Sequence, residues 1–260
     1  MKTLLSVSSV LAMAAMVTSC GNSGANKAAA DSTAMAVDSN VVVLFDGTSL
    51  DGWRGYNKDT LPGAWIIEDS CIKIQGSGAG EAGARNGGDL IYAAEKFGNF
   101  ELSFEWKVAK GSNSGVFYMI QEVPDAPAFY SAPEYQILDN ANHPDAKLGV
   151  DGNRTSASLY DLIPAKPQNA KPYGEWNTGK IMVYKGTVVH YQNGEQVLEY
   201  HLWTPEWKAM LDKSKFSKDK NPQAYELLTN CGGEQREGYI GLQDHGDDVW
   251  YRNIVVKKLD

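Results

Sequence analysis

The chain has 260 residues, of which 43% are hydrophobic and 10% aromatic, and its formal net charge is −8. This composition is sufficient for one substantial hydrophobic core. The acidic balance, with lysines concentrated only around residues 213–220, argues against nucleic acid as a partner.

The first 40 residues have the pattern of a bacterial lipoprotein leader. Residues 1–19 carry one early charge, Lys2, and an apolar stretch too short to cross a bilayer as a stable helix, directly before Cys20. We therefore predict a signal peptide over 1–19, lipidation of Cys20 and a flexible tether over 20–40. The predicted location is the bacterial cell envelope, facing the periplasm or on the outer-membrane surface. A plain secreted protein with an incidental cysteine is the alternative.

Short apolar or alternating runs follow one another from residue 41 to the end of the chain. They are separated by Gly, Asn, Asp and Pro, and none is followed by a convincing crossover helix. This pattern predicts a single all-β domain over 41–260, folded as a β-sandwich. The runs are 41–45, 64–68, 71–75, 90–93, 100–108, 115–120, 135–138, 180–193, 196–200, 238–243 and 249–257.

The clearest alternation lies in the run 100–108, where hydrophobic residues occupy the even positions and so form one core-facing side. The pairs Lys-Gly at 185–186 and Asn-Gly at 193–194 predict hairpin turns that join three strands into a meander. The best helix candidate lies in an insertion over 203–236, where Thr204 is a plausible N-cap and Pro205 the first helical residue.

Two predicted strands expose polar side chains opposite an apolar face. Near the C-terminus, Gln243 and His245 fall on the polar side of one strand, and in the segment PEYQILDN Glu134 and Gln136 do the same. If the two strands lie together, these groups form a polar cleft on a sheet, able to move protons or to bind sugar hydroxyls.

Asp139 has two open interpretations. The segment from Glu134 to Asp139 has the spacing of the E-x-D-x-x-E motif of jelly-roll glucanases, but Gln136 replaces the middle acid. A regular strand would place Asp139 opposite Glu134, so it serves an active site only if a bulge reverses its direction. The other interpretation is a turn residue before Asn140.

Several kinds of site are not supported by the sequence. None of the four histidines has a metal-ligand partner at convincing spacing, so we expect no metal and no other cofactor. A Gly-x-Ser-x-Gly elbow is absent, and neither Cys71 nor Cys231 has a plausible His partner for nucleophilic catalysis. These two cysteines are either buried free thiols or a disulfide bridge.

Several motifs together resemble the 3-keto-disaccharide hydrolase family, long classed as a domain of unknown function. The resemblance covers about residues 41–260, and the family implies a concanavalin-like jelly-roll β-sandwich that cleaves glycosides already oxidised at C3. The motifs, in chain order, are LFDGTSLDGW, FELSFEWKV followed by SNSGVFYM, PEYQILDN, GEWNTGKI with YQNGEQV, and GYIGLQDHGDDVWYRNIVVK.

The resemblance also suggests roles for individual residues. We expect Glu134 and His245 to be the proton-transfer pair, with Asp139 or Asp244 orienting a partner. The groups expected to hold hydroxyls or the keto oxygen are Gln136, Gln243, Lys107 and Asn113, and the further substrate-binding candidates are Asp244, Arg252 and Trp250.

The implied partner is a small carbohydrate, and two reaction routes remain open. A ketone at C3 acidifies the C2 proton, so a base can remove it and expel the C1 substituent, after which water adds back. An acid–base pair that hydrolyses the bond directly is the second route. The alternatives to a 3-keto-glycoside enzyme are a noncatalytic carbohydrate-binding lipoprotein and a retaining glucanase, the latter weakened by Gln136.

Overall fold

The computed structural model describes residues 39–78 and 82–260. The predicted signal peptide over 1–19, the lipidation site Cys20 and all but the last two residues of the tether over 20–40 lie outside this part of the chain. None of the helices in the described residues is long and apolar enough to cross a membrane.

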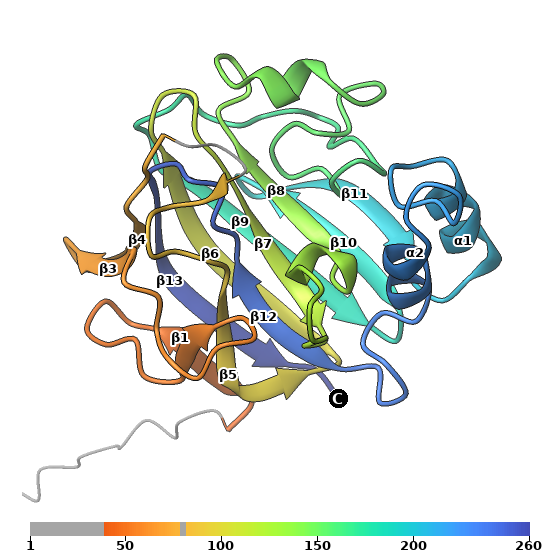
Figure 1. The fold of residues 1–260 in the computed structure, drawn as a ribbon, viewed down its shortest axis with the longest axis horizontal. Coiled ribbons are helices and arrows are strands. Elements are labelled where there is room, and N and C mark those ends of the chain that lie inside the picture. The colour runs from red at the N-terminus through yellow and green to blue at the C-terminus, as the bar shows by residue number, and fades with distance from the viewer. Residues whose placement is uncertain (1–38, 79–81) are drawn as a thin grey trace, which may run out of the picture. The chain divides into compact units, whose positions relative to one another are not determined.

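Two antiparallel sheets pack face to face, as predicted (Figure 1). The eight-stranded sheet has the order β11-β10-β9-β6-β13-β4-β3, with β1 also paired to β13, and the five-stranded sheet has the order β2-β5-β12-β7-β8. The strands are β1 (Val41–Phe45), β2 (Trp53–Gly55), β3 (Trp65–Glu68), β4 (Cys71–Ile74), β5 (Leu90–Phe97), β6 (Phe100–Val108), β7 (Asn113–Ile120), β8 (Glu134–Leu138), β9 (Asn177–Tyr184), β10 (Thr187–Gln192), β11 (Glu195–His201), β12 (Gly238–Leu242) and β13 (Val249–Lys258).

The main core lies between the two sheets. It receives the even-numbered hydrophobic residues of β6 and the apolar faces of β8 and β12, so the faces predicted from alternation are confirmed. The predicted core residues are all at most 3% exposed; they are Phe104, Trp106, Ile137, Ile240 and Leu242. The fold class is the predicted all-β jelly-roll sandwich.

The predicted meander is present as β9, β10 and β11, which are neighbours in the larger sheet. Lys185 and Gly186 have φ angles of 49° and 87°, and Asn193 and Gly194 have 50° and 85°. Two successive residues with positive φ are the geometry of a type I′ hairpin turn, which explains the Gly at each second position.

Two α-helices follow β11, although the sequence signals indicated one. The predicted helix is α1 (Pro205–Asp212), in which the Thr204 side chain accepts a hydrogen bond from the backbone N–H of Trp207. The second is α2 (Pro222–Thr229), which begins in the same way, with Asn221 as N-cap and Pro at the first position. The two helices contact each other, and the indole N–H of Trp207 donates to the carbonyl of Leu228 at 2.8 Å.

Cys71 and Cys231 are both buried and both free thiols. Burial raises the pKa of each thiol above its ordinary value, so neither is a nucleophile at neutral pH. Of the two interpretations that the sequence allowed, the structure has the free thiols.

A buried polar network ties the two sheets to the long segment after β8. The Tyr118 hydroxyl on β7 lies 2.8 Å from Nε2 of His190 on β10 and 2.6 Å from the Tyr200 hydroxyl on β11. The other ring nitrogen of His190 is 2.9 Å from the carbonyl oxygen of Ala157. Burial lowers the pKa of His190 to about 4, so the ring is neutral in the folded protein at neutral pH.

His190 should make the protein sensitive to acid. A base whose pKa is lower in the folded state stays neutral there while it protonates in the unfolded chain, so stability falls as the pH drops from about 6.5 to 4. We expect this group to contribute a loss of about 3 kcal/mol, at ~1.4 kcal/mol per pKa unit. Urea unfolding at several pH values, with the His190 ring followed by NMR, measures it; a ring that titrates near pH 6.5 would contradict the prediction.

Candidate active site

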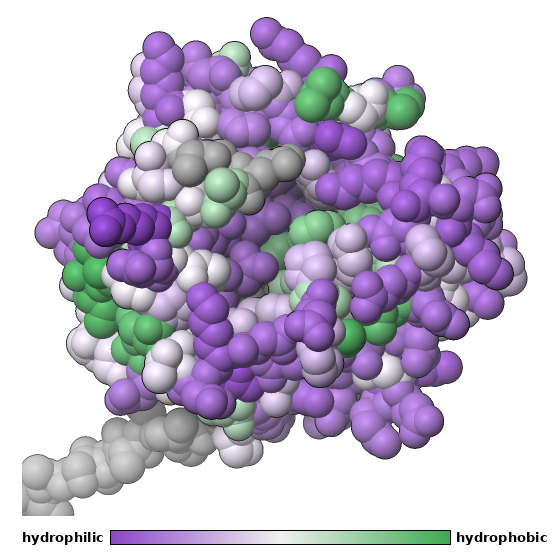
Figure 2. Space-filling view, in the orientation of Figure 1, coloured by the Kyte–Doolittle hydropathy of each residue, from purple (hydrophilic) through white to green (hydrophobic). Residues whose placement is uncertain are grey.

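A cavity of about 460 Å³ opens on the outer face of the five-stranded sheet. In the orientation of Figure 2 this face is hollowed near its centre, and hydrophilic and hydrophobic residues meet around the hollow. Its size is in the range of small-molecule sites in proteins. Its walls are formed by Asp89, Asn113, Pro127, Phe129, Glu134, Gln136, Tyr160, Lys215, Gln243, Asp244 and His245.

Strand alternation brings the two predicted polar segments to this cavity. Tyr135 on β8 points into the core, so Glu134 and Gln136 project from the outer face. Gln243 and His245 follow the end of β12, and the Gln243 N–H donates to the carbonyl of Gly115 on the intervening β7 at 2.9 Å. The predicted polar cleft is thus formed by strands β8, β7 and β12, side by side.

The side chain of Glu134 packs against the neighbouring strand β7 at Gly115. A Cβ atom added to Gly115 would collide with the carboxyl group of Glu134, so any other residue at this position would displace it. The glycine in the Asn-Ser-Gly motif therefore provides the space that holds Glu134 over the sheet.

Three polar atoms of the cavity residues are buried without a hydrogen-bond partner among the described residues. They are Oδ1 of Asn113, Oε1 of Gln243 and Nδ1 of His245. A buried polar atom without a partner costs free energy, so a ligand or water that reached these atoms would stabilise the residues of the cavity wall. Two of them are amide oxygens, which accept hydrogen bonds from hydroxyl groups.

Burial raises the pKa of the Glu134 carboxyl to about 8. The positive charge of Lys215 opposes this rise, while Asp89 and Asp145 add to it. Burial also lowers the pKa of Lys215, although Glu134 counteracts the effect. A carboxyl group whose pKa is shifted toward neutrality in a cavity is suited to proton transfer, because it can both accept and release a proton near pH 7.

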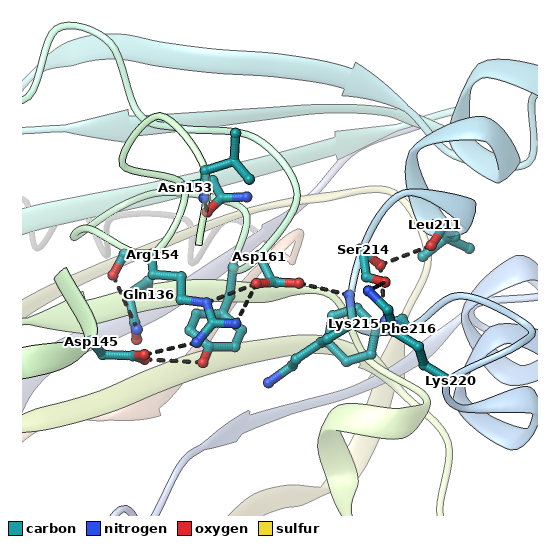
Figure 3. A network of polar contacts seen from close by, with 12 residues as sticks. Gln136, Asp145, Asn153, Arg154, Asp161, Leu211, Ser214, Lys215, Phe216 and Lys220 are labelled. Atoms are coloured by element: carbon teal, nitrogen blue, oxygen red, sulfur yellow. Dashed lines mark hydrogen bonds and ion pairs between the residues drawn. The ribbon is translucent and has the colours of Figure 1, made fainter. Parts of the chain in front are cut away.

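An ion-pair network outside the sheet holds two residues, Tyr160 and Lys215, that line the cavity together with Glu134 (Figure 3). Arg154 donates to Asp145 at 3.0 Å and to Asp161 at 2.7 Å, and the second oxygen of Asp161 accepts the backbone N–H of Lys215 at 2.8 Å. The second oxygen of Asp145 accepts the Tyr160 hydroxyl at 3.0 Å. The network therefore fixes two cavity residues that come from different loops.

Lys215 reaches over the cavity from the segment between α1 and α2. Its ammonium group lies 4.2 Å from the centre of the Tyr160 ring and 5.3 Å from that of Phe129, which belongs to the 3₁₀ helix η2 (Ala128–Tyr130). Sequence reasoning missed all three residues. The available signal was a lysine between Ser214 and Phe216 in the insertion, which looked like part of a solvated basic patch.

Asp244 and Asp89 connect the cavity to the glycine-rich loop before β5. The carboxylate of Asp244 accepts backbone N–H groups of Ala84 and Gly88 at 2.9 and 2.7 Å. The backbone N–H of Asp244 in turn donates to Asp89, and burial raises the pKa of that carboxyl to about 7. Asp244 therefore lines the cavity, but its carboxylate is already engaged in holding the loop.

Three residues that we expected to bind substrate do not reach the cavity, so this prediction was wrong for them. Lys107, Trp250 and Arg252 lie on β6 and β13, where they alternate with core residues and so point outward from the eight-stranded sheet. Their side chains stack on that outer face, with Lys107 4.6 Å from the Trp250 ring and Arg252 3.9 Å from the Trp176 ring. Alternation was right, but it cannot tell which of two sheets a strand joins.

Asp139 follows β8 and is not among the residues that line the cavity. Its carboxylate accepts hydrogen bonds from the backbone N–H groups of Gly111 and Ala141 and from the side-chain amide of Asn142. This is the geometry of a turn residue, which is one of the two interpretations that the sequence allowed. The candidate catalytic role of Asp139 has no support in this arrangement.

The tertiary structure brings together three side chains of the kinds that can bind a metal ion, a grouping that the sequence did not indicate. One ligand atom from each of His143, His245 and Asp247 lies within 4.8 Å of the other two. His143 is 102 positions before His245, which explains why spacing along the chain gave no signal.

The chain belongs to the 3-keto-alpha-glucoside-1,2-lyase-like domain family, which it matches over residues 40–257. A curated protein of Bacteroides thetaiotaomicron, named 3-keto-disaccharide hydrolase, is 64% identical over 240 residues, which are 88% of this chain and 82% of that protein. The family predicted from the motifs is therefore confirmed.

Solved structures from Parabacteroides distasonis ATCC 8503 have the same fold. One, described as a proposed glycosyl hydrolase, is 27% identical with a TM-score of 0.70, and the match covers 85% of this chain and 94% of that one. A second with the same description is 24% identical with a TM-score of 0.63, covering 84% and 99% of the two chains.

The buried carboxyl of Glu134 should reduce stability at neutral and alkaline pH. An acid whose pKa is raised by folding stays protonated in the folded state while it ionises in the unfolded chain, so stability falls between about pH 4.5 and 8. We expect Glu134→Gln to unfold like the wild type at pH 4 and to be more stable by on the order of 3 kcal/mol at pH 8. Urea unfolding measures both values. A less stable variant at pH 8 would mean that an ion pair with Lys215 dominates instead.

Proposed function

We propose that this protein cleaves the glycosidic bond of 3-keto-glycosides, such as 3-keto-disaccharides, in the cavity on the five-stranded sheet. The observation that carries the proposal is the buried Glu134, with its pKa raised to about 8, in a cavity with three unpartnered polar atoms. The name of the B. thetaiotaomicron relative and the description of the family support the same substrate class.

The ketone at C3 determines the route that we favour. It acidifies the proton on C2, so a base removes this proton, the electron pair forms the C1–C2 double bond, and the C1–O bond to the leaving group breaks. The leaving oxygen takes up a proton, and water then adds to the double bond. The sum is hydrolysis, which reconciles a lyase-like family description with a relative that is named a hydrolase.

Glu134 is the group that we assign to the C2 proton. Its ionised form is a stronger base than an ordinary carboxylate because burial raises its pKa, and Lys215 stabilises that form when it is generated. Asn113 and Gln243 offer amide groups to the sugar hydroxyls and the keto oxygen. The side chain of Gln136 is committed to the protein, because it donates to the carbonyl of Arg154 and accepts from the N–H of Ile137.

A retaining glucanase mechanism has less support. It requires two carboxyl groups on opposite sides of one bond, about 5 Å apart, but β8 carries Gln136 at the middle position of the glucanase motif. Asp139, at the last position, holds a turn.

Glu134→Gln should lower turnover of 3-keto-trehalose or 3-keto-lactose by about a hundredfold or more, because an amide cannot accept the C2 proton. In the wild type, kcat/KM should rise with pH to a plateau and reach half of its maximum near pH 8, since the ionised carboxylate is the active form. Sugar release and C2 proton exchange with deuterated water are the two measurements. The unoxidised parent sugars should not react, because their C2 proton is not acidic.

Lys107→Ala provides the matched control, since this residue lies on the outer face of the other sheet. It should retain wild-type turnover. Near-normal turnover in a folded Glu134→Gln variant, or binding of 3-keto-sugars without release by the wild type, would refute the assignment; the latter result would favour a noncatalytic binding protein.

We also propose that the protein is a lipoprotein of the bacterial envelope, because Cys20 follows a short apolar segment and Val-Thr-Ser. Cys20→Ala should move the protein from the membrane fraction to the soluble envelope fraction. Fractionation of cells and mass spectrometry of the mature N-terminus test this. A variant that stays with membranes, or a mature N-terminus elsewhere, would exclude lipidation at Cys20.

A further inference from the structure

The loop after β8 and the loop between β12 and β13 meet beside the cavity, both at the upper end of the sandwich in Figure 1. His143 lies at the start of the 3₁₀ helix η3 (Pro144–Lys147) in the first loop, and His245 and Asp247 lie in the second. Nδ1 of His245 is 3.9 Å from Oδ2 of Asp247, and the two imidazole rings are edge to face with centres 5.8 Å apart.

We propose that His143, His245 and Asp247 bind a divalent transition-metal ion at the wall of the cavity. Two ligands of one such ion, each at ~2.1 Å, lie about 3 to 4 Å apart, so the measured 3.9 Å already fits and the remaining separations, all within 4.8 Å, need only side-chain adjustment. Two imidazole nitrogens and a carboxylate suit Mn²⁺, Fe²⁺, Co²⁺ or Zn²⁺ rather than Ca²⁺ or Mg²⁺, which prefer oxygen ligands.

A second observation points to a ligand at the same place. Nδ1 of His245, the nitrogen that faces Asp247, is buried and has no hydrogen-bond partner among the described residues. A buried ring nitrogen with a carboxylate nearby but beyond hydrogen-bond distance is unsatisfied as it stands, and a cation between the two groups would satisfy both.

Backbone N–H groups orient two of the three side chains in this structure, and the contact to Asp247 is the one that persists when an ion binds. Oδ2 of Asp247 accepts the backbone N–H of Asn113 at 3.0 Å, which orients the carboxylate and leaves its other lone pairs free. Nδ1 of His143 accepts the backbone N–H of Asp145 at 3.1 Å, which orients the ring. An ion at Nε2 moves the ring proton to Nδ1 and so breaks this contact, but one neutral hydrogen bond is weak beside a metal–imidazole bond.

The position of the ion suggests what it does, a step that rests on the proposed function. His245 is the one member of the set that lines the cavity, so the ion lies beside the substrate and three protein ligands leave coordination positions open. A 3-keto-sugar offers two adjacent oxygens, the C3 ketone and the C2 hydroxyl, that can bind one ion together. The ion would then stabilise the negative charge that develops when Glu134 removes the C2 proton. His245 is a ligand in this arrangement and not a proton acceptor.

Metal binding is tested without any sugar, so that it stands apart from the proposed function. The protein is treated with EDTA, dialysed and titrated with Mn²⁺, Co²⁺ and Zn²⁺ by calorimetry. We expect one site of micromolar or tighter affinity for at least one ion, with His143→Ala and Asp247→Asn each weakening it by at least about a hundredfold. His201→Ala is the matched control, because this exposed histidine lies on β11 beside Glu199, and it should not change the affinity.

If the variants fail to fold, a measurement on the wild type still tests the metal site. Mn²⁺ should broaden the ring signals of His143 and His245 in NMR spectra more strongly than those of His190 and His201. The absence of a site of that affinity, or broadening at His201 alone, would overturn the metal site. Turnover of 3-keto-trehalose that persists undiminished in EDTA would overturn its role in the reaction. Loss in EDTA with recovery on adding the ion would support that role.

Discussion

The candidate site depends on one constraint, the burial of a carboxyl group on the outer face of a β-sheet. Glu134 is only 6% exposed, although it projects away from the core between the sheets. Gly115 on the adjacent strand makes this possible, because a side chain there would occupy the space of the carboxyl group. Burial without a full set of hydrogen bonds raises the pKa of Glu134 and so turns an ordinary acid into a group that can exchange protons near neutral pH.

The burial of Glu134 is maintained by segments that are not part of the sheets. Arg154 joins Asp145 to Asp161, and Asp161 in turn accepts the backbone N–H of Lys215, so the loop after β8 and the helical insertion are fixed to each other. Each charge in this network has a partner of opposite sign, which offsets the cost of partial burial. The five-stranded sheet carries Glu134. The loop after β8 and the helical insertion shield its carboxyl group from water and bring the ammonium group of Lys215 close to it.

The fold class and most of the strands could be predicted from the sequence, because local patterns determine them. Alternation along β6, β8 and β12 defined the core faces, and the pairs at 185–186 and 193–194 marked the hairpins. The helix α2 was missed, although Asn221 and Pro222 repeat the start signal of α1 and would have indicated it. For Lys107 and Trp250 the alternation was correct, but the sheet to which their strands belong was not predictable, since strand order depends on pairing between distant segments.

The family, the sandwich class and the polar faces that carry Glu134, Gln243 and His245 can be inferred from the sequence alone, because these follow from motifs and from the period of a strand. The groups that meet in the cavity could not be inferred in this way. Lys215 and Tyr160 reach it from loops without a periodic pattern, and His143 approaches His245 from 102 positions away. The physical reason is that the pKa of Glu134 and the surroundings of His245 depend on burial and on neighbouring charges, which exist only once distant segments pack together.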